Sequence, residues 1–133
     1  MKKESAFSIS KTTKGKLKSL PFEKIKIYIL GKNYELSVVF IGSKKSKSLN
    51  KKYRDKDKSA NALAFPLSKS NGEIFICPET AKRDAVKFKM RKNEFIIYLF
   101  IHGLLHLKGF AHGKKMEKEE EKIRLKFKNY TSD

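Results

Sequence analysis

Cysteine is almost absent from this chain, and several other signals are missing. Cys77 is the single cysteine among 133 residues, so an internal disulfide is excluded and a reducing compartment is favoured. The most apolar stretch, residues 95–107, is too short to cross a bilayer. The basic start, residues 1–3, is followed by polar residues rather than by the apolar run of a signal peptide. No internal repeat is visible. These absences predict a soluble, cytoplasmic protein without a membrane partner, folded as one domain over residues 1–133.

Acidic residues are scarce relative to basic ones. Only 14 Asp and Glu stand against 32 Lys and Arg, which gives a formal net charge of +18 at pH 7. Such an excess favours a polyanionic partner, because Lys and Arg neutralise phosphates and release counterions. A second explanation stays open, since a bias towards Lys, Ile, Phe and Asn also arises from an AT-rich genome. Charge alone therefore assigns no function.

The periodicity of the apolar residues predicts an α+β domain. Residues 1–19 carry no long apolar pattern and are expected to be poorly ordered, with some helix around residues 14–17. Residues 21–29 fit a strand or a helix, and helix is favoured. Ser43 and Asn93 are the expected helix caps, and Cys77 is expected in the core. The remaining expected elements are strands at 35–41, 61–66 and 73–77, the last two as a hairpin, and helices at 44–53, from 78 to 88, at 93–107 and at 114–127.

Histidine is also scarce, and all three copies lie in one segment, HGLLHLKGFAH. His102, His106 and His112 follow the spacing H-x-x-x-H-x-x-G-x-x-H. The first two are four residues apart, so on a helix their imidazoles share one face. Gly109 can end that helix and let the chain turn back towards the same point. Three neutral imidazoles predict a metal site, with zinc as the leading candidate and one tetrahedral position open, as catalytic sites require.

Two other interpretations of the histidine segment are weaker. A histidine on a buried helix is often a core residue, but burying two imidazoles one turn apart costs desolvation that a shared metal offsets. The spacing is also that of the zinc peptidase signature H-E-x-x-H-x-x-G-x-x-H, in which the glutamate is the general base. Gly103 occupies that position here, so peptide hydrolysis lacks its proton acceptor.

Three blocks, in order along the chain, resemble the YbeY family, the bacterial metal-dependent endoribonucleases of ribosomal RNA maturation. HGLLHLKGFAH is similar to the family's H-G-x-L-H-L-x-G-Y-D-H. Residues 49–66, LNKKYRDKDKSANALAFP, are similar to L-N-x-x-Y-R-x-K-D-x-P-T-D/N-V-L-S-F-P, and residues 72–77, GEIFIC, to G-D-I-x-I-x. The resemblance implies a small mixed sheet flanked by helices, with the metal at the bottom of a basic groove.

The resemblance also implies roles for particular residues. It places the ligands of one Zn²⁺ per chain on His102, His106 and His112, and the family's functional arginine on Arg54. A guanidinium can grip a phosphate with two hydrogen bonds, and a zinc held by histidines lowers the pKa of bound water, so Arg54 and His102 are the candidate catalytic residues. The implied activity is cleavage of single-stranded RNA in 16S rRNA 3′-end processing and in quality control of 70S ribosomes. The implied partners are rRNA and small-subunit components, and no DNA partner is expected.

The chain departs from the family pattern outside the metal ligands. Loss of the carboxylate at Ala111 removes a possible acceptor for a ligand N–H, and loss of hydroxyls at two alanines near the strand at 61–66 weakens the hydrogen bonding of the cleft. These changes put catalytic efficiency in doubt. The five departures are Ser59, Ala60, Ala64, Glu73 and Ala111, in place of Pro, Thr, Ser, Asp and Asp.

The general base and the nucleophile stay open at this level. Asp55, Asp57 and Glu73 are carboxylates that other elements could bring to the metal, and either water or the 2′-OH of the RNA could attack. A second function also stays open. In it the protein is a non-catalytic ribosome-assembly factor, whose zinc only pins the helix to the following loop.

Overall fold

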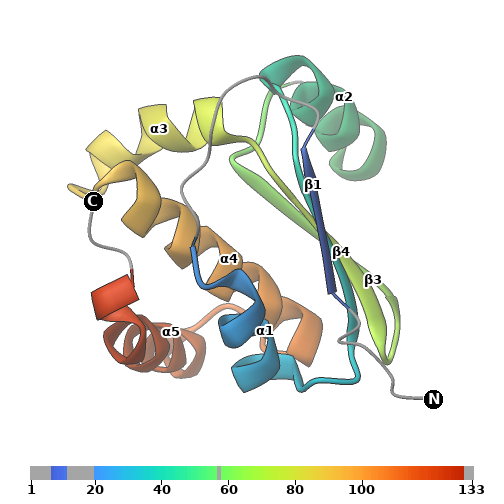
Figure 1. The fold of residues 1–133 in the computed structure, drawn as a ribbon. Coiled ribbons are helices and arrows are strands. Elements are labelled where there is room, and N and C mark those ends of the chain that lie inside the picture. The colour runs from blue at the N-terminus through green and yellow to red at the C-terminus, as the bar shows by residue number, and fades with distance from the viewer. Residues whose placement is uncertain (1–6, 12–19, 57, 131–133) are drawn as a thin grey trace.

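The computed structural model describes residues 7–11, 20–56 and 58–130. They form the expected α+β arrangement, a four-stranded mixed sheet with helices α1, α3, α4 and α5 gathered on one side and α2 lying apart from them at one end (Figure 1). None of the described helices is long and apolar enough to span a membrane. The elements are β1 (Phe7–Lys11), α1 (Phe22–Leu30), β2 (Glu35–Phe40), α2 (Ser43–Arg54), β3 (Ala62–Ser68), β4 (Asn71–Ile76), α3 (Pro78–Lys87), α4 (Lys92–Lys108), α5 (Lys114–Lys126) and the 3-10 turn η1 (Lys128–Tyr130).

The sheet has the order β1-β2-β4-β3, in which β3 alone runs antiparallel to its neighbour. Side chains alternate between the two faces of a strand, so the register decides what reaches the core. Val38 pairs with Ile74 and Phe40 pairs with Ile76, and all four side chains are buried. This register gives the sheet one apolar face, against which helix α4 packs.

Helix α4 runs through the centre of the molecule, as its sequence predicts. It contacts β3, β4, α1, α3 and α5, and residues on nearly all of its faces are buried. Phe100 lies edge-on to Phe22 of α1 at a centroid distance of 5.0 Å, which anchors α1 to α4. A helix enclosed in this way has no need of a polar face, which explains its continuous apolar sequence. Its rigid position fixes whatever side chains its C-terminal half carries.

Three details of the sequence-based description are wrong. A strand, β1, forms at Phe7–Lys11 within the stretch expected to be poorly ordered, and it pairs with β2. The residue before α2 is Gly42 rather than Ser43, and the residue before α4 is Arg91 rather than Asn93. Both helices therefore begin one or two residues early, within the range over which helix ends vary. The helix expected around residues 14–17 lies outside the described residues.

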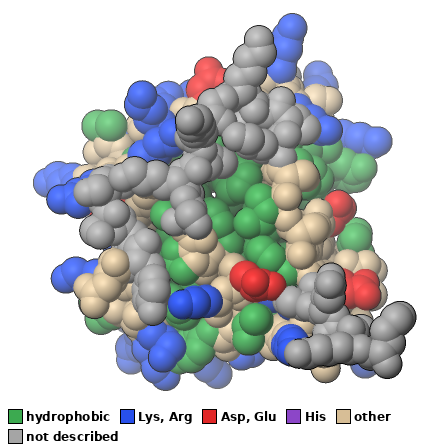
Figure 2. Space-filling model, in the orientation of Figure 1, with side chains coloured by type: hydrophobic (Ala, Val, Ile, Leu, Met, Phe, Trp, Pro, Cys, Tyr) green, Lys and Arg blue, Asp and Glu red, His purple; other side chains and the backbone are tan. Residues whose placement is uncertain are grey.

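On the face seen in Figure 2, basic side chains lie at the top, along the left edge and at the bottom, and the apolar surface lies nearer the middle. They do not gather into one patch on this face. The positive charge therefore marks no single binding surface on this side of the molecule.

Candidate functional site

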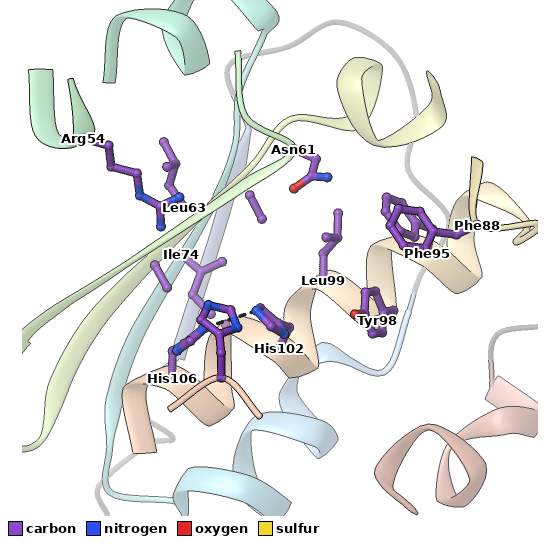
Figure 3. A pocket seen from close by; sticks show the side chains of 14 residues that line it. Arg54, Asn61, Leu63, Ile74, Phe88, Phe95, Tyr98, Leu99, His102 and His106 are labelled. Carbon is purple, nitrogen blue, oxygen red and sulfur yellow. Dashed lines mark hydrogen bonds between the residues drawn. The ribbon is translucent and has the colours of Figure 1, made fainter. Parts of the chain in front are cut away.

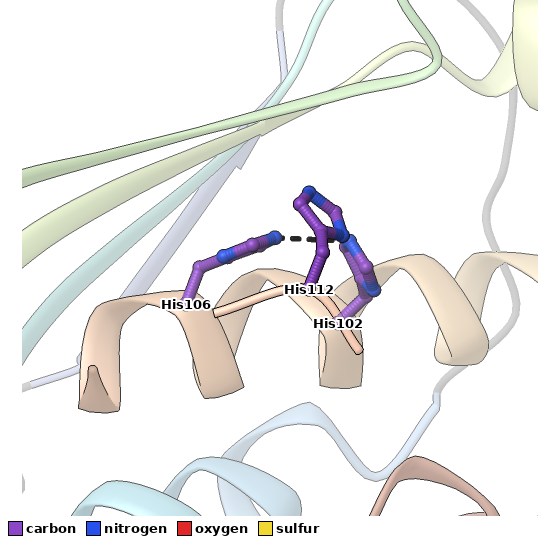
Figure 4. A group of neighbouring side chains, drawn as sticks. All are labelled: His102, His106 and His112. Carbon is purple, nitrogen blue, oxygen red and sulfur yellow. Dashed lines mark hydrogen bonds between the residues drawn. The ribbon is translucent and has the colours of Figure 1, made fainter. Parts of the chain in front are cut away.

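The three histidines meet at the C-terminal end of helix α4 (Figure 4). His102 and His106 project from consecutive turns of the helix. Gly109 then adopts φ 112°, the left-handed conformation that glycine tolerates, and ends the helix as expected. The chain turns back and brings His112, in the loop before α5, over the other two rings. The ring centroids lie 4.6 Å (His102–His106), 5.2 Å (His102–His112) and 4.5 Å (His106–His112) apart.

The nitrogen atoms of this cluster fit a metal ion. His102 Nε2 and His106 Nε2 are 3.1 Å apart, and one nitrogen from each of the three rings falls within 4.8 Å of the others. Tetrahedral zinc with bonds of about 2.0–2.1 Å needs ligand nitrogens roughly 3.3–3.4 Å apart, so small side-chain movements bring the rings to that spacing. An all-nitrogen set of three leaves a fourth position for water or substrate. The geometry does not distinguish zinc from other metals that imidazole binds.

A buried carboxylate behind the cluster orients one of the rings. Glu120 of α5 is only 4% exposed, and its Oε2 lies 2.5 Å from His102 Nδ1. With the Nδ1–H donated to Glu120, the Nε2 of His102 is left unprotonated and faces His106, which is the arrangement that metal-ligating histidines usually have. Sequence reasoning missed Glu120. The available signal was its spacing. Glu120 lies three or four residues from its neighbours in a buried row formed by Met116, Glu120, Ile123 and Phe127.

Electrostatics favour the neutral form of His106. Burial lowers the pKa of its imidazole, and the neighbouring His102 and His112 lower it further, while a hydrogen bond with the backbone of Phe110 acts in the opposite direction. Neutral imidazole is the form that coordinates metals. The ring of His102 therefore has a partner outside the cluster that fixes its orientation, the carboxylate of Glu120.

The cluster lies in a pocket of about 280 Å³ between α4, the β3–β4 hairpin and the end of α2 (Figure 3). Arg54, the last residue of α2, is exposed and points its guanidinium into this space from the side of His106. Asn61 lies on the far wall, where its amide nitrogen donates to Asp84 Oδ2 at 3.1 Å. The structure thus brings Arg54 and the three histidines to one cavity, as the sequence suggested.

No acidic side chain lines the pocket among the described residues. Asp55 follows Arg54 and is exposed, and Glu73 lies on the face of β4 opposite to the pocket-lining Ile74. Of the three carboxylates that the sequence left open as neighbours of the metal, Asp55 and Glu73 do not line the pocket, and Asp57 lies outside the described residues. Cys77 is 1% exposed and contacts Thr80, so its expected core role is confirmed.

Gly103 packs directly against the sheet. A Cβ atom added there would lie 3.1 Å from Ile74 Cδ1 and 3.6 Å from Ala64 Cβ. The peptidase signature needs a glutamate at this position, and the helix–sheet contact leaves no room for one. Packing therefore argues against peptide hydrolysis as strongly as the missing carboxylate does.

Comparisons with known proteins point to one family. The family model described as endoribonuclease YbeY matches residues 2–131. The endoribonuclease YbeY of Oenococcus oeni is 32% identical over 110 residues, covering 74% of this chain and 72% of that protein. That of Colwellia psychrerythraea is 38% identical over 87 residues, covering 60% of this chain and 56% of that protein. A solution structure from Thermotoga maritima superposes with a TM-score of 0.67 at 25% identity and covers 92% of this chain and 89% of that one.

Proposed function

The chain belongs to the endoribonuclease YbeY family, and from this premise we propose that it is a metal-dependent hydrolase that cleaves single-stranded regions of ribosomal RNA. The observation that carries the proposal is the meeting of three imidazoles and one arginine in a single pocket. The resemblance extends the proposal to zinc as the metal, to a cytoplasmic role in 16S rRNA 3′-end maturation and ribosome quality control, and to small-subunit components as partners.

The arginine and the three histidines of the pocket each have a part in this reaction. Arg54 grips a phosphate oxygen next to the scissile bond and stabilises the charge that develops on it. His102, held by Glu120, would hold a metal together with His106 and His112. A metal bound there would supply Lewis acidity for the activation of water and the polarisation of the phosphate. No carboxylate lines the pocket among the described residues, so the proposed reaction assigns no acidic side chain there as the proton acceptor.

The size of the pocket supports single-stranded RNA as the substrate. Its volume of about 280 Å³ is close to the lower limit of about 300 Å³ for ligand sites. A phosphate with one adjoining base fits such a space, whereas a paired helix does not. The helix that carries Arg54 into the pocket, α2, also bears exposed lysines, which add positive charge to this element.

Cleavage of a labelled single-stranded rRNA fragment tests the proposal. Wild type, Arg54→Ala and His106→Ala are compared, with Arg83→Ala as the matched control because Arg83 is an exposed arginine outside the pocket. We expect Arg54→Ala to reduce the cleavage rate by about 100-fold or more while RNA binding changes little. His106→Ala should lose both cleavage and the metal measured by elemental analysis, and Arg83→Ala should match wild type. Equal cleavage by all four proteins would reveal a contaminating nuclease and remove the enzymatic claim.

The second candidate is a non-catalytic rRNA-binding assembly factor with a structural metal. The absence of a carboxylate from the described lining of the pocket favours it, since many hydrolytic sites place a carboxylate as base. The same experiment separates the two. RNA binding without cleavage by metal-loaded wild type would support the assembly factor.

A further inference from the structure

A row of aromatic rings leads out of the pocket on the side away from Arg54 (Figure 3). Phe88 stacks on Phe95 at a centroid distance of 5.2 Å, and Phe95 is stacked with Tyr98 at 5.8 Å. Tyr98 in turn lies 6.1 Å from the ring of His102. The histidine cluster therefore has a guanidinium on one side and stacked aromatic rings on the other.

Phe88 is the most exposed ring of this row. Phe95 is 1% exposed and belongs to the core, whereas Phe88 is 56% exposed. One face of Tyr98 is covered, since the guanidinium carbon of Arg124 lies 5.5 Å from its centroid. Single exposed apolar side chains are common on proteins and mean little alone. Val86, 76% exposed on the same helix, lies outside the pocket, whereas Phe88 lines it.

The backbone holds Phe88 in place. It directly follows α3 in a tight turn, in which its N–H donates to Ala85 O at 3.1 Å. The N–H of Lys89 donates to Val86 O, and Lys89 takes a left-handed φ of 54°, uncommon for a lysine. A ring stacked on a core aromatic and fixed by such a turn loses little conformational freedom when a ligand binds.

We propose that Phe88 stacks an unpaired base of single-stranded RNA while a phosphate further along the same strand lies at the histidine cluster. This inference rests on the proposed function and adds to it the group that recognises the substrate. The face of the Phe88 ring away from Phe95 extends the aromatic stack by one base. Three exposed cations, Lys87, Lys89 and Arg91, lie within three residues of Phe88 in the sequence and suit the RNA backbone. Every base has a π face, so the subsite is tolerant of base identity. A base within a duplex is already stacked on its neighbours, so the subsite prefers unpaired over paired RNA.

The test is the binding of a short single-stranded RNA in which one abasic nucleotide is moved along the sequence. Full-length, metal-loaded protein is titrated against the labelled RNA and followed by fluorescence anisotropy, under conditions in which a gel shows the RNA intact. The variants are Phe88→Leu, which keeps apolar area but loses the π face, and Phe88→Tyr, which keeps the ring. Val86→Ala is the control for an exposed apolar residue outside the pocket.

With wild type, an abasic nucleotide at one position should weaken binding by about 5-fold or more, the lower end of base–aromatic stacking. Phe88→Leu should bind the intact RNA more weakly by a similar factor and show no further loss with the abasic RNA. Phe88→Tyr and Val86→Ala should behave as wild type. If Phe88→Leu keeps the full sensitivity to the abasic position, the base stacks elsewhere and the inference is overturned.

Cleavage assayed in parallel separates this inference from the proposed function. Wild type that cleaves RNA, with a Phe88→Leu variant equal to it in both assays, overturns the stacking subsite and leaves the endoribonuclease intact. Wild type that fails to cleave but loses affinity for abasic RNA through Phe88 retains the subsite and rejects the catalytic proposal. Thermal melting of each variant guards against misfolding. If Phe88→Leu is unstable, the wild-type scan still tests the subsite, because equal affinity for RNAs with the abasic nucleotide at every position would overturn it.

Discussion

Glu120 offers the sharpest test of how the metal centre is built. Its carboxylate lies 2.5 Å from His102 Nδ1 and is almost fully shielded from solvent, so salt screens this contact weakly. Partners that orient a metal-bound histidine typically contribute about 10–100-fold to metal affinity, or about 1.4–2.7 kcal/mol. Glu120→Gln keeps a hydrogen-bond acceptor and loses only the charge, so we expect the lower end of that range. Glu120→Ala loses both and should reach the upper end.

Competition with a chromophoric chelator measures the affinity for Zn²⁺ directly. Glu121→Gln is the matched control, because it removes the same charge from the next residue of α5, whose side chain is exposed. Thermal unfolding gives an independent readout. Metal stabilises the folded state according to its dissociation constant. At a fixed excess of Zn²⁺, the gain in the free energy of unfolding should therefore shrink by about 1.4–2.7 kcal/mol.

The metal-free protein should respond much less to these substitutions. The side chain of His102 is 28% exposed, so water can replace part of the lost hydrogen bond, and removal of a buried carboxylate also relieves its desolvation. A loss confined to the metal-loaded state therefore indicates orientation of the ligand, whereas an equal loss in both states indicates simple packing. Zn²⁺ affinity of Glu120→Ala within twofold of the Glu121→Gln control would refute the role given to Glu120.

Three further expectations concern stability, each measured by chemical denaturation. Gly72→Ala should cost about 1–3 kcal/mol, because its Cβ would lie 2.5 Å from Tyr34 Oη. That hydroxyl is buried with no hydrogen-bond partner among the described residues, so Tyr34→Phe should be neutral or stabilising. It should also reduce the cost of Gly72→Ala. If the stability changes of the two substitutions simply add in the double variant, the clash is contradicted. Gly109→Ala, at φ 112°, should cost about 1–2 kcal/mol, more than Gly42→Ala at φ −82°, and equal losses would remove the argument from backbone strain. Burial lowers the pKa of Lys26, so between the lowered and the ordinary pKa the unfolded chain binds more protons than the folded chain. The stability of wild type relative to Lys26→Met should therefore rise with pH through that window. If the difference in stability does not change with pH, this lysine stays charged when folded.

Strong periodicity made most of the fold predictable from the sequence. The apolar helix α4, the β3–β4 hairpin and the glycine that ends α4 all follow from local residue patterns, and the structure has them. Strand β1 was missed for a physical reason. It lies at the edge of the sheet, three of its five residues are polar, and Ile9 is 47% exposed. Pairing with β2 stabilises such a strand, and its local residue pattern does not predict a partner strand that lies far along the chain.

The site divides in the same way. The histidine spacing is local and could be interpreted without the fold, and the position of Arg54 followed from a resemblance in the second block. Glu120 and Phe88 reach the site only because α5 and α3 pack against α4. A buried acidic residue within an apolar stripe was the one available sign for Glu120. For Phe88 the sequence gives a wrong impression, since helical spacing after Ala81 and Ala85 suggests a core residue, and the helix ends one residue too early for that.

Three of the five departures from the family pattern weigh less against activity once they are placed in the fold. Glu73 faces away from the pocket. The backbone of Ala60 is fixed at both its N–H and its carbonyl by Ser46 Oγ, at 2.8 and 2.6 Å, so a hydroxyl on residue 60 is not needed to order that segment.

Ala111 is the departure beside the metal ligands. The concern there was an acceptor lost for a ligand N–H, yet Glu120 supplies a buried acceptor to His102 from a different helix. An acceptor on α5, which packs against α4, is held more rigidly than one in the exposed loop that carries Ala111. The orientation of His102 therefore depends on the α4–α5 contact, and substitutions that loosen this contact should weaken metal binding even when they lie far from the histidines.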